Sequence, residues 1–201
     1  MIITEIEALN RSKTQIVIDD DIRFVLPAQA VGSLGLFAGQ ELSDREYSYI
    51  YEEYIKRPAK LKALNLLERR DYTKKELCDK LKQQGFPESA VSEALSYVES
   101  YHYVDDVRYT QSYLSYRCAG KSRQMIYQTL LSKGVDAQTV RSCMEELEID
   151  DIKNIERLCF QKFGDIQGIS PEKKQKIFNY FLRKGYKYGD IASVIKEFDS
   201  I

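Results

Sequence analysis

The chain has 201 residues, of which 43% are hydrophobic and 30% are charged, so it can bury a sizeable core beneath a well-solvated surface. Its 30 Lys and Arg residues nearly balance its 31 Asp and Glu residues, and the net charge of -1 excludes a protein that coats nucleic acid by charge alone. No apolar run reaches the roughly 20 residues of a membrane span, and the N-terminus lacks the pattern of a signal peptide. We therefore expect a cytoplasmic protein that does not enter a membrane.

Four cysteines are spread along the chain with no C-x-x-C pair, and His102 is the single histidine. A zinc site needs clustered ligands, which this spacing does not supply. We predict reduced thiols, no metal site and no cofactor. The cysteines are Cys78, Cys118, Cys143 and Cys159.

Residues 1–42 are predicted to form a β-rich segment. Apolar residues alternate on both sides of the triplet 19–21, which indicates a hairpin with strands at 14–19 and 22–26 and a third strand at 2–9. The Asp residues of the triplet suit a turn better than a cation site. Gly32, Gly35 and Gly39 are predicted to lie in the turns of a loop after the strands. Their spacing is not that of a nucleotide-binding loop, so we do not expect a nucleotide site there.

Residues 43–58 are predicted to form a connecting helix. Ser43 and Glu46 match a capping box at its start. Four apolar or aromatic residues then share one helical face, and Pro58 either begins a new helix in its first turn or kinks this one. The shared face consists of Tyr47, Ile50, Tyr51 and Tyr54.

The remainder of the chain repeats. Gly85, Gly134 and Gly185 lie 49 and 51 residues apart, and apolar residues recur at the same distances from each glycine without gaps. The matching positions are Leu77, Leu81, Phe86, Val91, Leu95 and Val98 in the first copy, Ile126, Leu130, Val135, Val140, Met144 and Leu147 in the second, and Ile177, Phe181, Tyr186, Ile191, Ile195 and Phe198 in the third.

Each glycine is predicted to end a helix in a left-handed conformation, and the apolar residue after it folds back onto that helix. Thr73, Ser122 and Ser170 are suitable N-caps for these helices. A further helix precedes each cap, at roughly 58–70, 105–118 and 151–163. The fold class is therefore mainly α, with three tandem three-helix repeats of helix-turn-helix type at 59–104, 105–149 and 150–201.

The sequence offers little support for catalysis. His102 lies at a helix end with no Ser or Cys partner that spacing would identify as a nucleophile. Asp105 and Asp106 precede a helix, where N-capping explains them. We therefore expect a protein that is not an enzyme.

Residues 97–133 interleave tyrosines with Arg and Lys. Such a mixture can stack bases and hold phosphates, although Tyr109, Tyr113 and Tyr116 share one helical face and suit helix packing better. Basic residues recur at the start of the middle helix in every repeat, where a positive charge opposes the helix dipole, which suggests a use outside folding. They are Lys74 and Lys75, then Arg117, Lys121 and Arg123, then Lys173, Lys174 and Lys176.

Residues 63–77 resemble the opening repeat of RecX proteins, the bacterial regulators of the RecA recombinase. The stretch 103–109, with Arg117 and Gly120, resembles the central motif of that family, as does 126–135. Met125 departs from the pattern, since an Arg-Ile pair is common there. The resemblance covers about residues 59–198 and is weaker in the third copy, and the N-terminal segment resembles the extension found in Gram-positive members.

This resemblance implies a non-enzymatic regulator that binds RecA filaments on DNA, lodges in their groove and limits their growth in recombination, DNA repair and the SOS response. It also implies weak, salt-sensitive binding to single- and double-stranded DNA, and we expect a monomer. The candidate contact residues are Arg70, Lys74, Lys75, Arg108, Arg117, Lys121, Arg123, Lys133, Lys173, Lys174 and Lys176.

Two alternatives stay open at this stage. A helix-turn-helix transcriptional or architectural DNA-binding protein would have one basic recognition helix and usually a dimer interface. A scaffold would bind other proteins without DNA.

Overall fold

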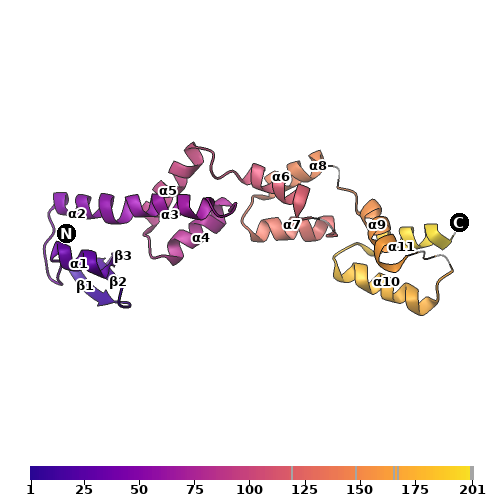
Figure 1. Ribbon diagram of the computed structural model, residues 1–201, viewed down its shortest axis with the longest axis horizontal. Coiled ribbons are helices and arrows are strands. Elements are labelled where there is room, and N and C mark those ends of the chain that lie inside the picture. The colour runs from indigo at the N-terminus through magenta and orange to yellow at the C-terminus, as the bar shows by residue number, and fades with distance from the viewer. Residues whose placement is uncertain (119, 148, 165, 167, 200–201) are drawn as a thin grey trace. The chain divides into compact units, whose positions relative to one another are not determined.

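A computed structural model of the chain describes residues 1–118, 120–147, 149–164, 166 and 168–199, apart from the side chains of 197–199. It forms two compact units, Met1–Asp105 and Asp106–Ile201 (Figure 1). The predicted fold class is confirmed, because the chain is mainly helical with a small sheet at its N-terminus. In the part of the chain that the structure describes, no helix combines the length and apolarity needed to cross a bilayer.

The first unit begins with an antiparallel sheet of β1 (Ile3–Ala8), β2 (Lys13–Ile18) and β3 (Ile22–Pro27), in that order. The predicted hairpin and third strand are both confirmed. Asp19 and Asp20 adopt positive φ angles of 51° and 59° in the hairpin turn, a conformation that Asp tolerates. A carboxylate oxygen of Asp19 also accepts a 2.7 Å bond from the Ile2 N–H, which fastens the start of β1 to the turn.

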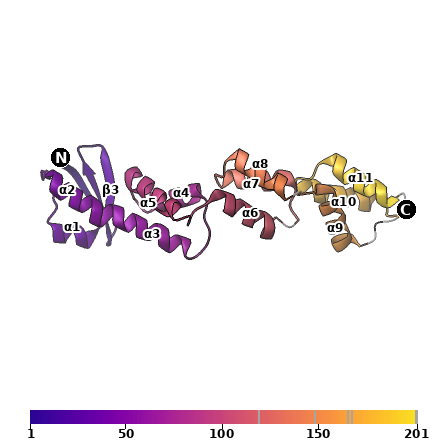
Figure 2. The ribbon, with the colours of Figure 1, turned by 90° about the horizontal axis from the view of Figure 1, so that it is seen from above.

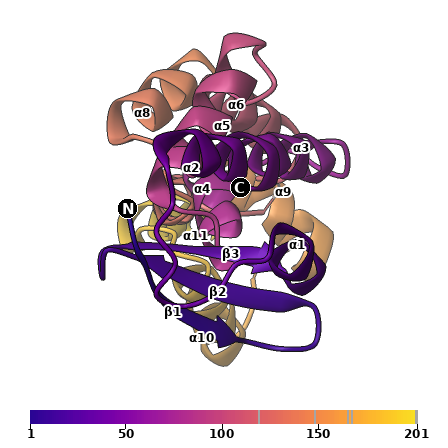
Figure 3. The ribbon, with the colours of Figure 1, turned by 90° about the vertical axis from the view of Figure 1, so that its left-hand side faces the viewer.

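A short helix, α1 (Ala28–Leu34), follows the sheet and lies next to β3 (Figure 3). The predicted loop here was wrong in part, because Gly32 lies inside this helix. The alanines at positions 28 and 30 favour the helix, and Ala30 is buried. Gly35, with φ of 62°, is the glycine that ends it.

The connecting helix is a continuous run of α2 (Asp44–Ile50), a π-helical segment η1 (Tyr51–Lys56) and α3 (Arg57–Leu67). The predicted capping box of Ser43 and Glu46 is confirmed. Pro58 lies in the first turn of α3, as the first of its two predicted placements had it, and the helical run continues through this point because Lys56 and Arg57 keep helical backbone angles. The Arg57 N–H bonds to the Glu52 carbonyl five residues back, and this wider turn accommodates a proline that has no N–H to donate.

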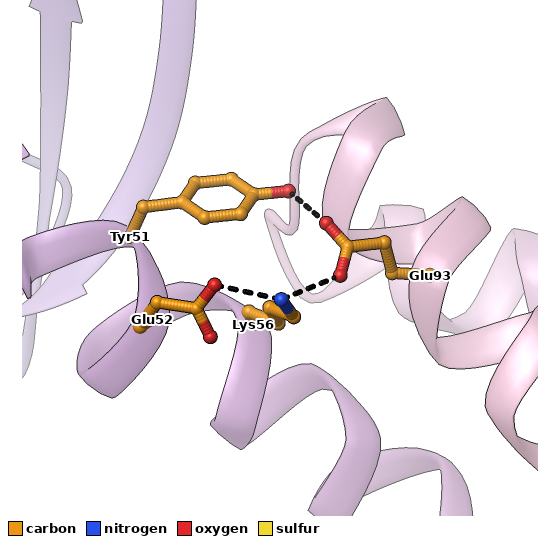
Figure 4. A network of polar contacts seen from close by, with 4 residues as sticks. All are labelled: Tyr51, Glu52, Lys56 and Glu93. Carbon is orange, nitrogen blue, oxygen red and sulfur yellow. Dashed lines mark hydrogen bonds and ion pairs between the residues drawn. The ribbon is translucent and has the colours of Figure 1, made fainter. Parts of the chain in front are cut away.

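The π-helical segment is tied to α5 (Glu88–Ser100) by a small polar network (Figure 4). The Lys56 ammonium lies 2.7 Å from Glu52 and 3.0 Å from Glu93, and the Tyr51 hydroxyl donates to Glu93 over 3.1 Å. Hydrogen bonding from Lys56 is the main reason that the pKa of Glu93 is lowered. These contacts set the orientation of α3, which packs against α5 (Figure 2).

All three predicted glycine turns are present. They join α4 (Lys74–Gln83) to α5, α7 (Arg123–Ser132) to α8 (Ala137–Glu146), and α10 (Pro171–Arg183) to α11 (Tyr188–Asp199). The glycine φ angles are 91°, 85° and 80°. In the first turn the Gly85 N–H bonds to the Lys82 carbonyl and the Phe86 N–H to the Leu81 carbonyl, which is a Schellman motif. The other two turns make the same pair of bonds.

Three apolar clusters correspond to the repeats. One joins the sheet to α2–α5, and the other two lie in the second unit, beneath α6 (Asp106–Tyr116) and α9 (Asp151–Phe163). The predicted core positions are buried, or half-buried at Phe86, with one exception. Leu147 is 46% exposed because it directly follows α8 and the chain turns away there. The side chain of Phe198 lies outside the described residues. The predicted N-caps Thr73, Ser122 and Ser170 are all confirmed.

Gly85 generates the first prediction. A Cβ at this position would lie 2.5 Å from Cγ2 of Val25 in β3, and the backbone is left-handed. Gly85→Ala should therefore destabilise the protein by more than the roughly 1–2 kcal/mol of a left-handed alanine. Urea unfolding measures this free energy.

Gly39→Ala is a matched control, because Gly39 has φ of 85° but nothing within 4 Å of the added Cβ. In a Val25→Ala background, the effect of Gly85→Ala should shrink but stay above that of the control, because Cβ of residue 25 remains 2.9 Å from the added Cβ. An equal effect of Gly85→Ala and Gly39→Ala in the otherwise wild-type protein would show that the sheet does not press on this turn.

Candidate interaction surface

The middle helix of each repeat begins with a capped first turn that carries basic residues. The hydroxyls of Thr73, Ser122 and Ser170 accept bonds from N–H groups in the first turns of α4, α7 and α10, at 3.1, 3.1 and 3.4 Å. Because the caps already satisfy these N–H groups, the cations there are not required to start the helices. The predicted candidates in these turns are Lys74, Lys75, Arg123, Lys173 and Lys174, and Lys176 follows in α10.

In the first unit, two of the three candidates contact their own unit. The Arg70 guanidinium lies 4.0 Å from the centre of the Tyr72 ring, and the Lys74 ammonium lies 2.8 Å from Glu99. Lys75 is exposed. An exposed pair such as Lys74–Glu99 stabilises the fold by only about 0–1 kcal/mol, so it does not explain why cations recur here.

In the second unit, the tyrosines of α6 separate into two groups. Tyr109 and Tyr113 are 6% and 5% exposed, which supports helix packing for these two rings. Tyr116 is 83% exposed, so its predicted packing role was wrong. It is the last residue of α6, where the helix face that buries the other two rings ends. Lys133 lies 5.8 Å from the Tyr109 ring centre.

The cations around the turn between α6 and α7 differ in exposure. Arg108 on α6 and Arg117 after it are exposed, as are Lys173 and Lys176 on α10. Lys121 is half-buried, and its ammonium donates a hydrogen bond to the Tyr113 hydroxyl over 2.5 Å. Lys121 is therefore less accessible to a partner than the exposed cations. Lys174 is also half-buried.

Polar contacts join the second three-helix domain to the third. The Arg123 N–H donates to the Asp151 carboxylate over 2.9 Å, while the Arg123 guanidinium donates within the second domain, to the Ile149 carbonyl over 2.7 Å. The Asn154 amide donates to the Lys121 carbonyl over 3.1 Å, and the Lys184 ammonium donates to the Gly120 carbonyl over 3.2 Å. We call this set of contacts the seam.

The seam corrects one inference from the sequence. No acidic residue lies between positions 109 and 133, which suggested that Arg123 has no acidic neighbour. Asp151 supplies one from the start of α9. Burial is the main cause that raises the pKa of Asp151, the charge of Asp190 adds to it, and the bond from the Arg123 N–H opposes it.

A cleft of about 330 Å³ lies beside the seam. Its lining includes three residues that sequence reasoning missed, Tyr127, Arg141 and Lys187. Arg141 and Lys187 each follow a buried repeat position, Val140 and Tyr186, which marks them as solvent-facing. Nothing in the sequence indicates that they share a cleft, because they come from different repeats.

The four cysteines are free thiols, as predicted, and burial raises the pKa of Cys159 to about 11. Over the described ranges, no group of three or more His, Cys, Asp or Glu side chains is placed to hold a metal ion.

The fold and these helix starts define a helical-repeat protein of tandem three-helix domains. Residues 59–97 and 105–144 match the models of the first and second three-helix domains of RecX. The chain is 31% identical over 198 residues to the regulatory protein RecX of Caldanaerobacter subterraneus subsp. tengcongensis, covering 97% of this chain and 98% of the relative. The chain therefore belongs to the RecX family of regulatory proteins.

Two solved structures agree in fold. A crystal structure of regulatory protein RecX, 21% identical, aligns with a TM-score of 0.62 over 98% of both chains. The crystal structure of RecX from Lactobacillus salivarius, 25% identical, aligns with a TM-score of 0.61 over 72% of this chain and 97% of that one.

Asp151 generates the second prediction. Its pKa is raised in the folded state, so the folded protein holds this proton more tightly than the unfolded chain does. That contribution to stability is present at low pH and is lost as the pH rises from about 4 through the raised pKa. Asp151→Asn keeps an oxygen acceptor for the Arg123 N–H but removes the titration.

Urea unfolding of both proteins across this pH range gives the test. The free energy of unfolding of the wild type, minus that of the Asp151→Asn variant, should fall as the pH rises to neutrality. The pH dependence that comes from the other carboxylates is shared by both proteins and therefore cancels in this difference. A difference that is constant, or that grows with pH, would contradict the burial of Asp151 at the seam.

Proposed function

We propose that this protein binds RecA filaments on DNA and limits their growth and activity in recombination and DNA repair. The observation that carries the proposal is the match along nearly the whole chain to a relative named as a regulatory RecX protein. We further propose that it acts in the cytoplasm as a monomer during the SOS response, and that its own binding to DNA is weak and salt-sensitive.

The charge distribution supports a filament-binding protein over a helix-turn-helix transcriptional regulator. A regulator of that type inserts a basic recognition helix into the major groove, usually the last helix of the three-helix unit. Here the last helix of the first domain, α5, contains three Glu and no Lys or Arg. In α8 one Arg accompanies two Glu. Basic residues occur instead at the starts of the middle helices in all three domains.

The third prediction concerns activity. RecA hydrolyses ATP on single-stranded DNA and exchanges strands, and the protein should lower both at substoichiometric amounts, because one molecule can cap or bridge several RecA subunits. ATP hydrolysis and strand exchange, each with and without the protein, provide the measurement. Unchanged rates at a one-to-one ratio of the two proteins would rule out the proposed function.

The fourth prediction concerns the contact surface. Arg117, Lys173 and Lys176 are exposed, so reversing their charges with Glu should leave the melting temperature nearly unchanged. Binding should weaken by at least tenfold, because three charges that would face phosphates or acidic side chains change sign. Co-sedimentation with RecA filaments measures binding, and circular dichroism measures melting.

The control reverses Arg11, Lys80 and Lys153, which are also exposed and lie outside the candidate set. Both triple variants change the net charge by the same amount, so a general electrostatic effect would weaken them equally. Equal binding by the two variants would remove the candidate residues from the contact surface. Lys121 and Arg123 are left unchanged because their side chains also bond within the second domain.

A further inference from the structure

The cleft beside the seam is built from two three-helix domains. Tyr127 and Arg141 come from α7 and α8 of the second domain, and Lys187 comes from the turn before α11 of the third. The two domains have separate apolar cores, and the polar contacts of the seam lie beside this cleft. Its volume of about 330 Å³ is at the small end for ligand sites, and it suits one compact group rather than a duplex.

One wall of the cleft combines an aromatic ring with a guanidinium. Tyr127 is half-buried and packs against the core of the second domain, which holds its ring in place. The Arg141 guanidinium donates to the Tyr127 hydroxyl over 3.2 Å, and its centre lies 5.7 Å from the ring centre. The guanidinium therefore contacts the hydroxyl end of Tyr127 and does not stack closely on the ring.

The charges of the cleft are mixed. Arg141 and Lys187 are exposed cations, and Glu145 is an exposed carboxylate on the same lining. Asp151 also lines the cleft, with its carboxylate bonded to the Arg123 N–H. Gln124 adds an amide that can both donate and accept a hydrogen bond.

This combination fits a nucleotide better than an acidic peptide. A base presents a flat face for Tyr127 and edges with both donors and acceptors, which Glu145 and Gln124 can match. Its flanking phosphates would pair with Arg141 and Lys187. An acidic peptide would also pair with the two cations, but it would leave the ring of Tyr127 without a partner.

We propose that this cleft holds one unstacked nucleotide of single-stranded nucleic acid, with its base against Tyr127 and its phosphates near Arg141 and Lys187. The proposal deepens the proposed function by giving a place for direct DNA contact. It requires no RecA, so it can fail or succeed independently of that function. Because the ligand would contact both domains, it would add a bridge beside the polar seam.

Fluorescence anisotropy of a labelled oligothymidylate, with the full-length protein at low salt and without RecA, tests the proposal. Arg141→Ala with Lys187→Ala should weaken binding by roughly tenfold or more. It should also make the salt dependence shallower, by about 0.7 in log-log slope for each phosphate that the variant no longer neutralises. Arg11→Ala with Lys80→Ala removes the same charge from exposed positions of the first unit and should change affinity by less than about twofold.

Tyr127 separates stacking from charge. Tyr127→Phe keeps the ring and its packing but loses the bond from Arg141, so binding should remain within a few-fold of wild type. Tyr127→Leu removes the ring and should weaken binding by roughly tenfold. Arg141→Lys with Lys187→Arg keeps both charges and should restore most of the affinity that the alanine pair loses, which shows that loss of folding is not the cause.

Three results would overturn the proposal. The first is wild-type protein that does not bind the oligonucleotide at low salt. The second is equal weakening by the cleft pair and the control pair. The third is a poly-glutamate peptide whose binding depends on Arg141 and Lys187 while oligonucleotide binding does not, which would assign the cleft to an acidic protein partner. Unchanged RecA activity with intact cleft-dependent oligonucleotide binding would reject the proposed function and keep this one.

Discussion

Each three-helix domain depends on one backbone conformation, the left-handed glycine that ends its middle helix. The glycine lets two successive N–H groups return to carbonyls of the last helical turn, and the residue after it then points back at the helix. That reversal brings the third helix against the second, so the apolar residues of both can share one core. The same lack of a Cβ allows close approach, since Gly85 faces Val25 of the sheet and Gly185 faces the Ser122 hydroxyl of the neighbouring domain.

The two close approaches have different surroundings. Around Gly85 the sheet and the first domain share one apolar cluster, so separating them would expose hydrophobic area at about 25 cal/mol per Å². Around Gly185 the neighbouring cores are separate, and the connection includes hydrogen bonds that Asp151 accepts and that Asn154 and Lys184 donate. A typical hydrogen bond contributes only about 0.5–1.5 kcal/mol net, because water competes for the same groups. The polar seam is therefore the junction more easily altered by pH, salt or a ligand.

Local patterns made most of the fold predictable. Alternation gave the three strands, and the glycine-anchored apolar spacing gave the helices and their core, because both depend on residues within a few positions of each other. The failures occurred where tertiary structure overrides such patterns. Gly32 is held inside α1 beside the sheet, and Leu147 and Tyr116 lie at helix ends where the buried face stops. The cleft could not be predicted from the sequence, because its residues come from different repeats and meet only in the folded protein.

The candidate cations show why composition alone says so little about this protein. A net charge of -1 excludes nonspecific coating, yet each capped start of a middle helix carries one or more cations that are not needed to begin the helix. The third helices carry the compensating carboxylates, most clearly in α5. Within a domain, the chain reversal at the glycine turn therefore separates the charges. Basic residues lie at the start of the middle helix, and carboxylates lie along the third helix. A partner that presents both phosphates and protein side chains is complementary to such a surface.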